Sequence, residues 1–237
     1  MKLDKYPILL MLLLTSCIST RNIPDDDQLF VGLTKISYDD TLNTSNSSLF
    51  TSHLTDTKAE VEAALATAPN GALFGSSYYR VPFSWRLWVH NRFGGKESAF
   101  AKWVDKSFGR PPVLMSTVNP ALRASVAQSV LKNNGFFRAV VTYEPVPRKN
   151  PKKSKIAYHV RLDSLFTYDS IAYVGFPDIP RHLIDSTAAE ALIKPGDPFS
   201  VSSLEGERSR IGNLLLNNGY FYYNPGYVNY LADTIDV

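Results

Sequence analysis

The chain has 237 residues and a formal net charge of only +3, with acidic and basic side chains interspersed along its length. This balance argues against nucleic acid as a partner, because such proteins carry a strongly basic face. The length is enough for two domains of ordinary size. A single cysteine excludes an internal disulfide framework.

The first residues have the pattern of a secretory signal peptide. Lys2 and Lys5 precede an apolar run from Ile8 to Leu14, which is too short to span a bilayer as a permanent helix. The string Leu-Thr-Ser-Cys follows directly and ends at Cys17, and it resembles the lipobox of bacterial lipoproteins. That resemblance implies cleavage before Cys17 and acylation of the new N-terminus, for example with palmitate, which would hold the chain on a membrane.

A lone cysteine can also be an inert buried thiol, but Cys17 lies where a lipobox requires its cysteine. We therefore expect residues 1–16 to be a signal peptide. Residues 17–28 are expected to form the lipidated N-terminus and a solvated tether, because they contain Pro24 and the run Asp25-Asp26-Asp27. A calcium site at these aspartates is the alternative, although three consecutive side chains do not easily converge on one ion.

The hydrophobic periodicity of the remaining chain predicts a series of strands and helices. Strands are expected at 30–38, 139–144, 156–162, 170–174 and 226–231. Helices are expected at about 58–68, from Pro120 to a stop at Gly135, at 180–192, and from Ser200 or Ser202 to Asn218. A polar loop is expected at 43–52, and Thr55-Asp56-Thr57 and Asn119 are the expected caps of the first two helices. The helix from Pro120 is expected to bury Leu122, Val126, Val130 and Leu131 on one face.

A short string occurs twice in the chain. Leu-Lys-Asn-Asn-Gly-Phe-Phe at 131–137 reappears as Leu-Leu-Asn-Asn-Gly-Tyr-Phe at 215–221, an offset of 84 residues (215 − 131). Each copy closes an amphipathic helix and opens a stretch of strand formers, which indicates a repeated modular unit. Gly135 and Gly219 are expected to be structural turns that take the left-handed conformation, so that the aromatic pair folds back onto the helix.

The order strand, helix, helix, strand, strand, together with Ile-Lys-Pro-Gly-Asp-Pro-Phe at 193–199, resembles the POTRA domain of outer-membrane assembly factors of the BamA/TamA superfamily. The segments 75–80, 83–92, 100–108 and 112–120 are similar to the lipid-anchored TamL type of that superfamily. The resemblance implies an α+β fold of tandem POTRA-like domains, in which two helices pack on a three-stranded sheet. Domain 1 is expected at 29–163 with a helical insertion at about 69–112. Domain 2 is expected at 164–237, truncated before a last strand that would begin at 234–237.

The same resemblance implies a location and partners. The chain would be anchored to the bacterial outer membrane by its N-terminal lipid, face the periplasm, and precede a membrane β-barrel in cis beyond residue 237. It would work with a TamB-like periplasmic protein and with unfolded outer-membrane clients. The expected function is a docking and chaperone-like scaffold of an outer-membrane assembly or translocation machine. The alternatives are a stand-alone adaptor and, from another class, a lipid-anchored periplasmic hydrolase or carbohydrate-binding lipoprotein.

The insertion concentrates aromatic and cationic residues, and it contains all three tryptophans of the chain. Helical spacing places Trp85, Trp88 and Arg92 near one face, and Phe100, Trp103, Val104 and Phe108 on another. These rings either pack on the first domain as core or form an exposed surface for a protein partner or a lipid interface. The candidate partner surface comprises Tyr78, Tyr79, Arg80, Trp85, Arg86 and Trp88.

A second candidate site uses backbone groups. The strand formed by Ala139, Val140, Val141, Thr142 and Tyr143 is expected at the sheet edge, where an extended client segment can add by β-augmentation. The basic run 148–155 is expected to be a solvated hairpin loop, with anionic lipid headgroups as the alternative target.

No catalytic, cofactor or metal constellation is expected. The four histidines are scattered, and the chain has neither a nucleophile motif nor a phosphate-binding loop. Glu97 and Asp105 are the only carboxylates near the rings of the insertion that a hydrolase could use.

Overall fold

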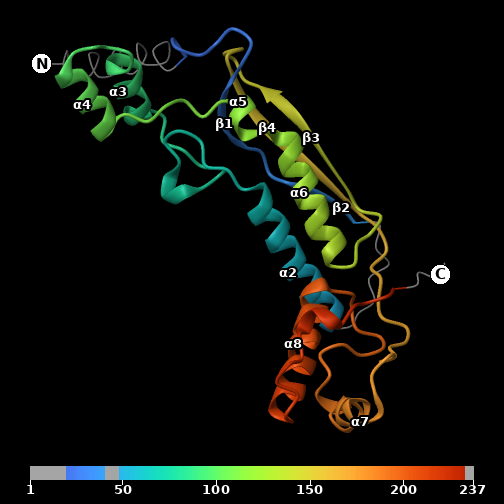
Figure 1. The fold of residues 1–237 in the computed structure, drawn as a ribbon. Coiled ribbons are helices and arrows are strands. Elements are labelled where there is room, and N and C mark those ends of the chain that lie inside the picture. The colour runs from blue at the N-terminus through green and yellow to red at the C-terminus, as the bar shows by residue number, and fades with distance from the viewer. Residues whose placement is uncertain (1–19, 41–47, 233–237) are drawn as a thin grey trace, which may run out of the picture. The chain divides into compact units, whose positions relative to one another are not determined.

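The computed structural model describes residues 20–40 and 48–232. Its strands are β1 (Leu29–Leu33), β2 (Ser37–Asp40), β3 (Val140–Pro147) and β4 (Lys153–Leu162). Its helices are α2 (Ser48–Leu65), α3 (Trp85–Phe93), α4 (Ala99–Phe108), α5 (Met115–Val118), α6 (Pro120–Asn133), α7 (Asp178–Ser186) and α8 (Val201–Asn217), with 3-10 turns η1 (Leu73–Gly75), η2 (Ala188–Glu190) and η3 (Pro225–Tyr227) (Figure 1). The fold is therefore mixed α+β, as predicted.

The described residues divide into two compact units. Unit 1 comprises the described parts of 1–41, 58–130 and 139–162, and unit 2 comprises those of 42–57, 131–138 and 163–237. Unit 1 contains the sheet and the helices α3, α4 and α5, and unit 2 contains α7 and α8.

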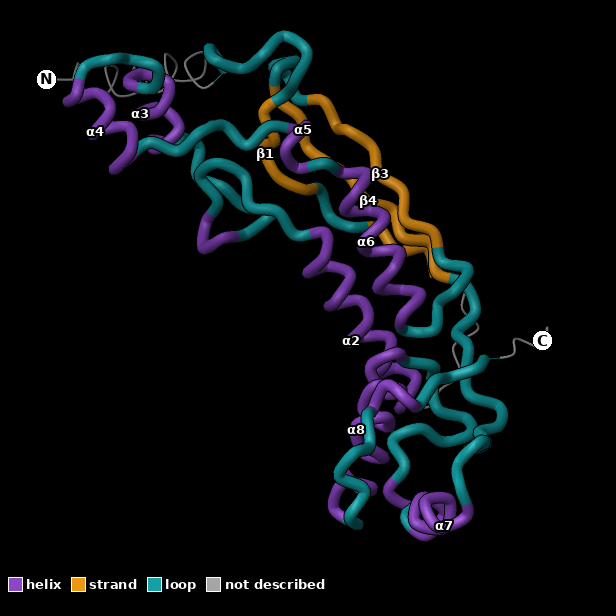
Figure 2. The backbone as a smooth tube through the Cα atoms, viewed as in Figure 1, coloured by secondary structure: helices purple, strands orange, loops and turns teal. Residues whose placement is uncertain are grey.

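β4 is the central strand of the sheet in unit 1, because every other strand pairs with it. β3 runs antiparallel to β4 from the pair Val140–Arg161 to the pair Pro147–Ser154, and the two lie side by side in Figure 2. β1 and β2 both run parallel to β4. The single strand expected at 30–38 is thus two strands, separated by residues 34–36. The ladder of β1 is itself irregular between Phe30 and Leu33, where Gly32 has a φ of +114° that a regular strand does not accommodate.

The core of unit 1 follows the alternation of β4. Ile156, Tyr158, Val160 and Leu162 are at most 1% exposed, whereas His159 and Arg161 between them are exposed. β1 is buried along its whole length, which is typical of a strand covered on both faces.

The buried face predicted for α6 is correct only at its C-terminal end, where Leu131 is buried and Val130 is half-buried. Leu122 is 59% exposed and Val126 is 45% exposed, whereas the small residues Ala124 and Ala127 are buried. The reason lies in the neighbouring Arg123, whose Nη1 donates to the carbonyls of residues 64 and 66 at the end of α2 (3.3 and 3.0 Å). The side of α6 that faces α2 is therefore set by this arginine and by small side chains that allow close approach.

The start predicted for α2 is also wrong. The helix begins at Ser48, within the expected loop, and Thr55-Asp56-Thr57 lie inside it instead of capping it. Thr57 is buried and its hydroxyl donates to the carbonyl of His53, four residues earlier (2.7 Å). Thr57, Val61 and Leu65 form the buried stripe of α2 at a spacing of four residues.

The strands predicted at 170–174 and 226–231 are wrong. The described residues of unit 2 contain no strand, and η3 lies where the second one was expected. In unit 1 every other strand pairs with β4, and no described strand takes that place in unit 2. A segment without a neighbouring strand cannot form a ladder, so both segments remain irregular.

The helices of unit 2 lie near their predicted positions. α8 begins where expected, and the Ser200 side chain caps it by accepting a hydrogen bond from the Ser203 amide (3.5 Å). α7 ends at Ser186, earlier than the predicted 192, and η2 follows it. Ile184, Ile211, Leu215 and Val228 form the buried apolar cluster of this unit.

The two copies of the repeated string adopt the same helix-ending turn. In the first copy the Phe136 amide donates to the Leu131 carbonyl (2.9 Å), and in the second the Tyr220 amide donates to the Leu215 carbonyl (3.1 Å). Gly135 and Gly219 have φ values of +88° and +92°. This is the Schellman arrangement, which requires a residue that tolerates the left-handed region.

Candidate functional site

β3 is an edge strand of the sheet. β1 pairs with residues 153–156 of β4, and β2 pairs with 159–162, so the two follow one another along one side of β4. β3 pairs with β4 from 154 to 161 and therefore occupies the other side. Within 20–40 and 48–232, no further strand pairs with the outer side of β3.

The direction of the backbone groups of β3 follows from one hydrogen bond. The Arg148 amide donates to the Lys153 carbonyl (3.1 Å) at the base of the hairpin. Backbone groups alternate between the two sides of a strand, so even-numbered residues of β3 face β4 and odd-numbered residues face outward. Pro145 and Pro147 have no N–H, and the outward donors of the strand are therefore those of Val141 and Tyr143.

The side chains of the predicted edge segment differ in exposure. Thr142 and Tyr143 are exposed and Val140 is half-buried. Val141 is buried on the core side of the sheet, and Ala139, which is also buried, lies just before the strand. The open part of the edge is consequently short and is defined by main-chain groups more than by side chains.

The insertion is a helical hairpin of α3 and α4. The His90 Nδ1 and Asp105 Oδ1 atoms lie 2.9 Å apart and connect the two helices. Leu87, Val89 and Ala101 are the buried side chains of this hairpin. Asp105, one of the two carboxylates that a hydrolase could use, is thus engaged in holding α3 against α4.

Burial divides the six residues of the predicted partner surface into two sets. Tyr79 and Trp85 are 72% and 49% exposed, and Arg86 is exposed with its guanidinium 5.8 Å from the Trp85 ring centre. Tyr78, Arg80 and Trp88 are half-buried. Only the first set offers an open aromatic and cationic surface.

Residues 20–28 are largely exposed to solvent, as predicted, but they do not form a free tether. Ile23 is 5% exposed and belongs to an apolar cluster with Leu29, Val31 and Leu87, so it connects the start of the chain to β1 and α3. The ammonium of Lys152 lies 2.8 Å from the Asp25 carboxylate. The segment before β1 is therefore fastened to unit 1 by apolar and polar contacts.

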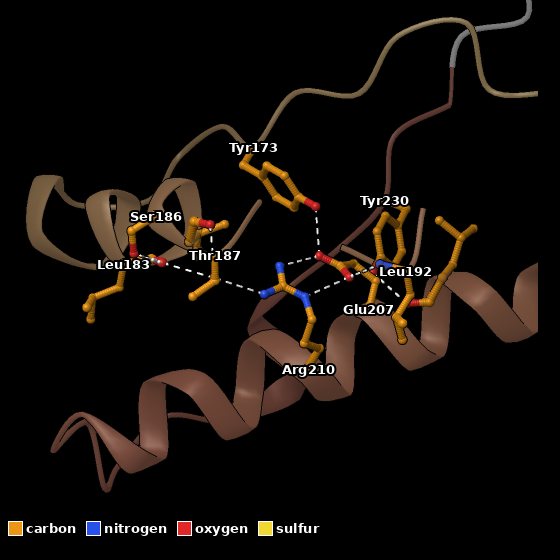
Figure 3. Close-up of polar contacts among 10 residues, drawn as sticks. Tyr173, Leu183, Ser186, Thr187, Leu192, Glu207, Arg210 and Tyr230 are labelled. Carbon is orange, nitrogen blue, oxygen red and sulfur yellow. Dashed lines mark hydrogen bonds and ion pairs between the residues drawn. The ribbon is translucent and has the colours of Figure 1, made fainter. Parts of the chain in front are cut away.

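Unit 2 contains a buried cluster of charged and polar groups (Figure 3). The Glu207 side chain is fully buried, and the Arg210 guanidinium donates to it from Nε (2.9 Å) and Nη2 (2.6 Å). The Tyr173 hydroxyl (2.7 Å) and the Leu192 amide (2.9 Å) donate to the same carboxylate. Arg210 also donates to the Thr187 hydroxyl (2.9 Å). The cluster joins α8 to the segments on both sides of α7 and η2.

The ionisation of this cluster follows from its hydrogen bonds. Burial alone would raise the pKa of Glu207, but the hydrogen bonds from Arg210, Leu192 and Tyr173 outweigh it, and the pKa lies below the ordinary value of 4.5. Burial and the Glu207 carboxylate raise the pKa of Tyr173 to about 12. Glu207 and Arg210 are therefore both charged at neutral pH. Three groups donate to the carboxylate, an arrangement that suits a structural clamp.

Sequence reasoning missed this clamp, although the sequence carries a signal for it. Glu207, Ile211 and Leu215 are spaced by four residues and share the buried stripe of α8. A glutamate on an apolar stripe requires a partner, and Arg210 lies one turn away on the same helix.

A second polar group missed by sequence reasoning lies on the open face of the sheet. Ser37 Oγ and His159 Nδ1 are 2.6 Å apart, and His159 Nε2 lies 3.5 Å from Glu144. The side chains of His159 and Glu144 are 50% and 63% exposed, so water competes for every contact. The three residues come from β2, β4 and β3. Only the pairing of the strands brings them together, so no sequence motif could have predicted the group.

Cys17, the predicted lipidation site, lies outside the described residues. Across 20–40 and 48–232, none of the helices has the length and apolar character needed to span a membrane. The chain matches no family model, no curated protein and no solved structure.

Proposed function

We propose that the chain is a lipid-anchored periplasmic scaffold of an outer-membrane assembly or translocation machine, built on tandem POTRA-like domains. It binds extended segments of a partner or client by adding them as a strand to the outer side of β3. The observation that carries this proposal is the pair of outward N–H groups of Val141 and Tyr143 on a strand whose outer side no described strand covers.

The order of elements in unit 1 supports the POTRA-like interpretation. β1 and β2 are followed by α2 and α6, and then by the hairpin of β3 and β4, with α3, α4 and α5 inserted between the two longer helices. Apart from the division of the first strand into β1 and β2, this order is similar to the β-α-α-β-β order that the sequence resemblance implies, with the insertion between the two longer helices. The identical turns at Gly135 and Gly219 support a second copy of the same unit.

Recognition through the main chain suits a client that varies in sequence. Strand addition uses N–H and C=O groups that every residue carries, and the side chains of the added strand alternate freely. Unfolded strands of a membrane β-barrel have this alternating character. Pro145 and Pro147 close the far part of the edge, which limits the length of the added segment and prevents unlimited edge-to-edge association.

Tyr143→Pro tests the proposal at one outward N–H. The residue is 43% exposed and its N–H points away from β4, so proline removes an outward donor without removing a hydrogen bond of the sheet. We expect a fluorescent peptide copied from a membrane β-strand to bind about tenfold more weakly, since one hydrogen bond contributes about 1 kcal/mol and the proline ring obstructs the approach. Fluorescence anisotropy with the chain from residue 17, carrying Cys17→Ser, measures this change.

Tyr143→Thr is the matched control because it removes the ring and keeps the N–H. The proposal requires that this variant bind the peptide as the parent chain does. Equal binding by the proline variant would contradict it, and equal weakening by both variants would assign recognition to the ring instead of the backbone. Thermal melting of each variant excludes unfolding as the cause.

A further inference from the structure

A ladder of three neighbouring rings, in tilted and edge-to-face contact, lies exposed on α4. Phe100 and Trp103 have ring centres 6.3 Å apart, and Trp103 and Phe108 have centres 5.9 Å apart. The three side chains are 66%, 58% and 43% exposed. The rings therefore shield one another only in part, and their outer faces remain in contact with solvent.

The same insertion exposes further large apolar side chains. Those of α3, η1 and the loop between them are Leu73, Phe74, Tyr79, Phe83 and Trp85, with exposed fractions from 39% to 106%. Phe74 also has a positive φ of 50°, a backbone conformation that an aromatic residue rarely adopts. Exposed apolar side chains gathered in this way are typical of a site that a membrane or another protein covers.

The insertion also carries a net positive charge. Residues 72–112 contain seven Lys and Arg but only two Asp and Glu, a balance of +5 (7 − 2), whereas the remaining chain has 18 basic and 20 acidic residues (25 − 7 and 22 − 2). Lys102 and Lys106 flank Trp103 on α4, and both are exposed. Rings beside lysine and arginine are typical of segments that lie in the interface of an anionic membrane.

The predicted lipid attachment site lies a few residues before a segment that contacts this hairpin. Ile23 packs in the same buried cluster as Leu87 of α3, and the Asn22 side chain donates to the Asn91 carbonyl (3.4 Å). Cys17 is separated from Thr20 by three peptide units, which span at most about 11 Å. Acyl chains on Cys17 would consequently hold α3 and α4 next to the membrane surface.

We propose that the hairpin of α3 and α4 is seated in the interface of an anionic phospholipid membrane, with Phe100, Trp103 and Phe108 at the boundary between headgroups and acyl chains. Lys102 and Lys106 contact the phosphates of the headgroups. This inference rests on the lipid anchoring contained in the proposed function, and it adds the surface by which unit 1 meets the membrane.

The tryptophans provide a direct test, because all three lie at 85, 88 and 103. The chain from Cys17 onward, which keeps every described residue, is coupled through its only thiol to a maleimide phospholipid in vesicles of phosphatidylethanolamine and phosphatidylglycerol. Brominated acyl chains quench tryptophans that they touch. We expect bromination to lower the emission about twofold, and to do so as well in a Trp85→Phe, Trp88→Phe variant, in which Trp103 is the only reporter.

A matched pair of variants separates the ring ladder from general apolar contact. Phe100→Ser with Phe108→Ser is expected to restore most of the emission, since both rings are exposed and their loss does not empty a core. Phe221→Ser with Tyr222→Ser, which changes rings that are 78% and 98% exposed in unit 2, is expected to leave the quenching unchanged. Equal restoration by both pairs would overturn the assignment to α4.

Three results would overturn the proposal. Unquenched emission from coupled chains that float with the vesicles would show that the hairpin stays in water. A blue shift without bromine quenching would assign the rings to a protein contact. Equal quenching in phosphatidylcholine vesicles, which carry no net charge, would show that the hairpin does not require anionic headgroups and would contradict the proposal.

Lipidation itself is measured separately, by the mass of the N-terminal peptide of the chain after expression in a bacterium. Its absence would contradict the anchoring without changing the result of the chemical coupling.

Discussion

Unit 1 and unit 2 bury their polar backbone in different ways. In unit 1 one strand, β4, pairs with every other strand, and its core-facing side chains are apolar except for Ser154 and the hydroxyl of Tyr158. In unit 2 the described residues contain no strand, and α8 takes the central position with Glu207 on its buried stripe. The carboxylate of Glu207 accepts a hydrogen bond from the Leu192 backbone amide.

The comparison shows how a unit without a sheet can provide hydrogen bonds to buried backbone groups. A buried carboxylate loses its hydration, and that loss is offset only when several donors surround it. Glu207 has donors from Arg210, Tyr173 and Leu192. We infer that this clamp connects separate segments of unit 2 by hydrogen bonds, as β4 connects the strands of unit 1.

The largest expected effect is the loss of one partner of the clamp. Arg210→Met leaves the Glu207 carboxylate buried without its counter-charge, and breaking such a pair typically costs about 3–5 kcal/mol. We expect hydrogen exchange of the α8 amides to accelerate strongly while the β4 amides keep their protection. Equal acceleration in both elements would contradict the separation of the two units.

The double variant Glu207→Leu with Arg210→Met is the control, because it removes both charges and is expected to recover most of the lost stability. A pH titration gives a second readout. Since the folded pKa of Glu207 lies below 4.5, the carboxylate contributes stability above about pH 4.5 and loses it as the pH falls through the folded pKa. Glu207→Gln should lack this acid-dependent loss in α8.

The sequence predicts best the features that depend on neighbouring residues. Pro120 and Gly135 delimit α6, and Ser200 and Gly219 delimit α8, because caps and left-handed turns act within a few residues. The alternation in β4 likewise predicts its buried face. These features gave the α+β class and the repeated turn correctly.

The features that failed depend on partners distant in sequence. The segments 170–174 and 226–231 have strand-forming residues but no central strand beside them. Periodicity placed Leu122 on an apolar face of α6, but the contact of Arg123 with the end of α2 decides which face is buried. The sequence likewise did not determine whether Phe100 and Trp103 are exposed, because a stripe of rings along a helix does not show which distant segment covers it.

Gly135 and Gly219 occupy the same position in the two copies of the repeat, so the same substitution can be compared at both. A Cβ on Gly135 would meet the backbone oxygens of Phe199 and Phe166 at 3.0 and 3.1 Å, whereas a Cβ on Gly219 would meet nothing within 4 Å. Both positions have a positive φ, so alanine costs about 1 kcal/mol at each. Overpacking adds about 1–3 kcal/mol at Gly135 alone. Chemical denaturation of Gly135→Ala and Gly219→Ala measures the difference, and equal costs would show that the two turns have the same surroundings.

The smallest expected effect contrasts a tyrosine of each unit. The Tyr158 hydroxyl is buried in unit 1 without a hydrogen-bond partner in the described part of the chain, and burial raises its pKa to about 12. Removing an unsatisfied buried hydroxyl is neutral or stabilising by about 1 kcal/mol, so Tyr158→Phe is expected to keep or raise the melting temperature. Tyr173→Phe removes a donor to the Glu207 carboxylate and is expected to destabilise unit 2 by about 1.5–3 kcal/mol. A clear loss of stability in Tyr158→Phe would mean that an ordered water satisfies its hydroxyl, and the core of unit 1 would then depend on a buried polar contact just as unit 2 does.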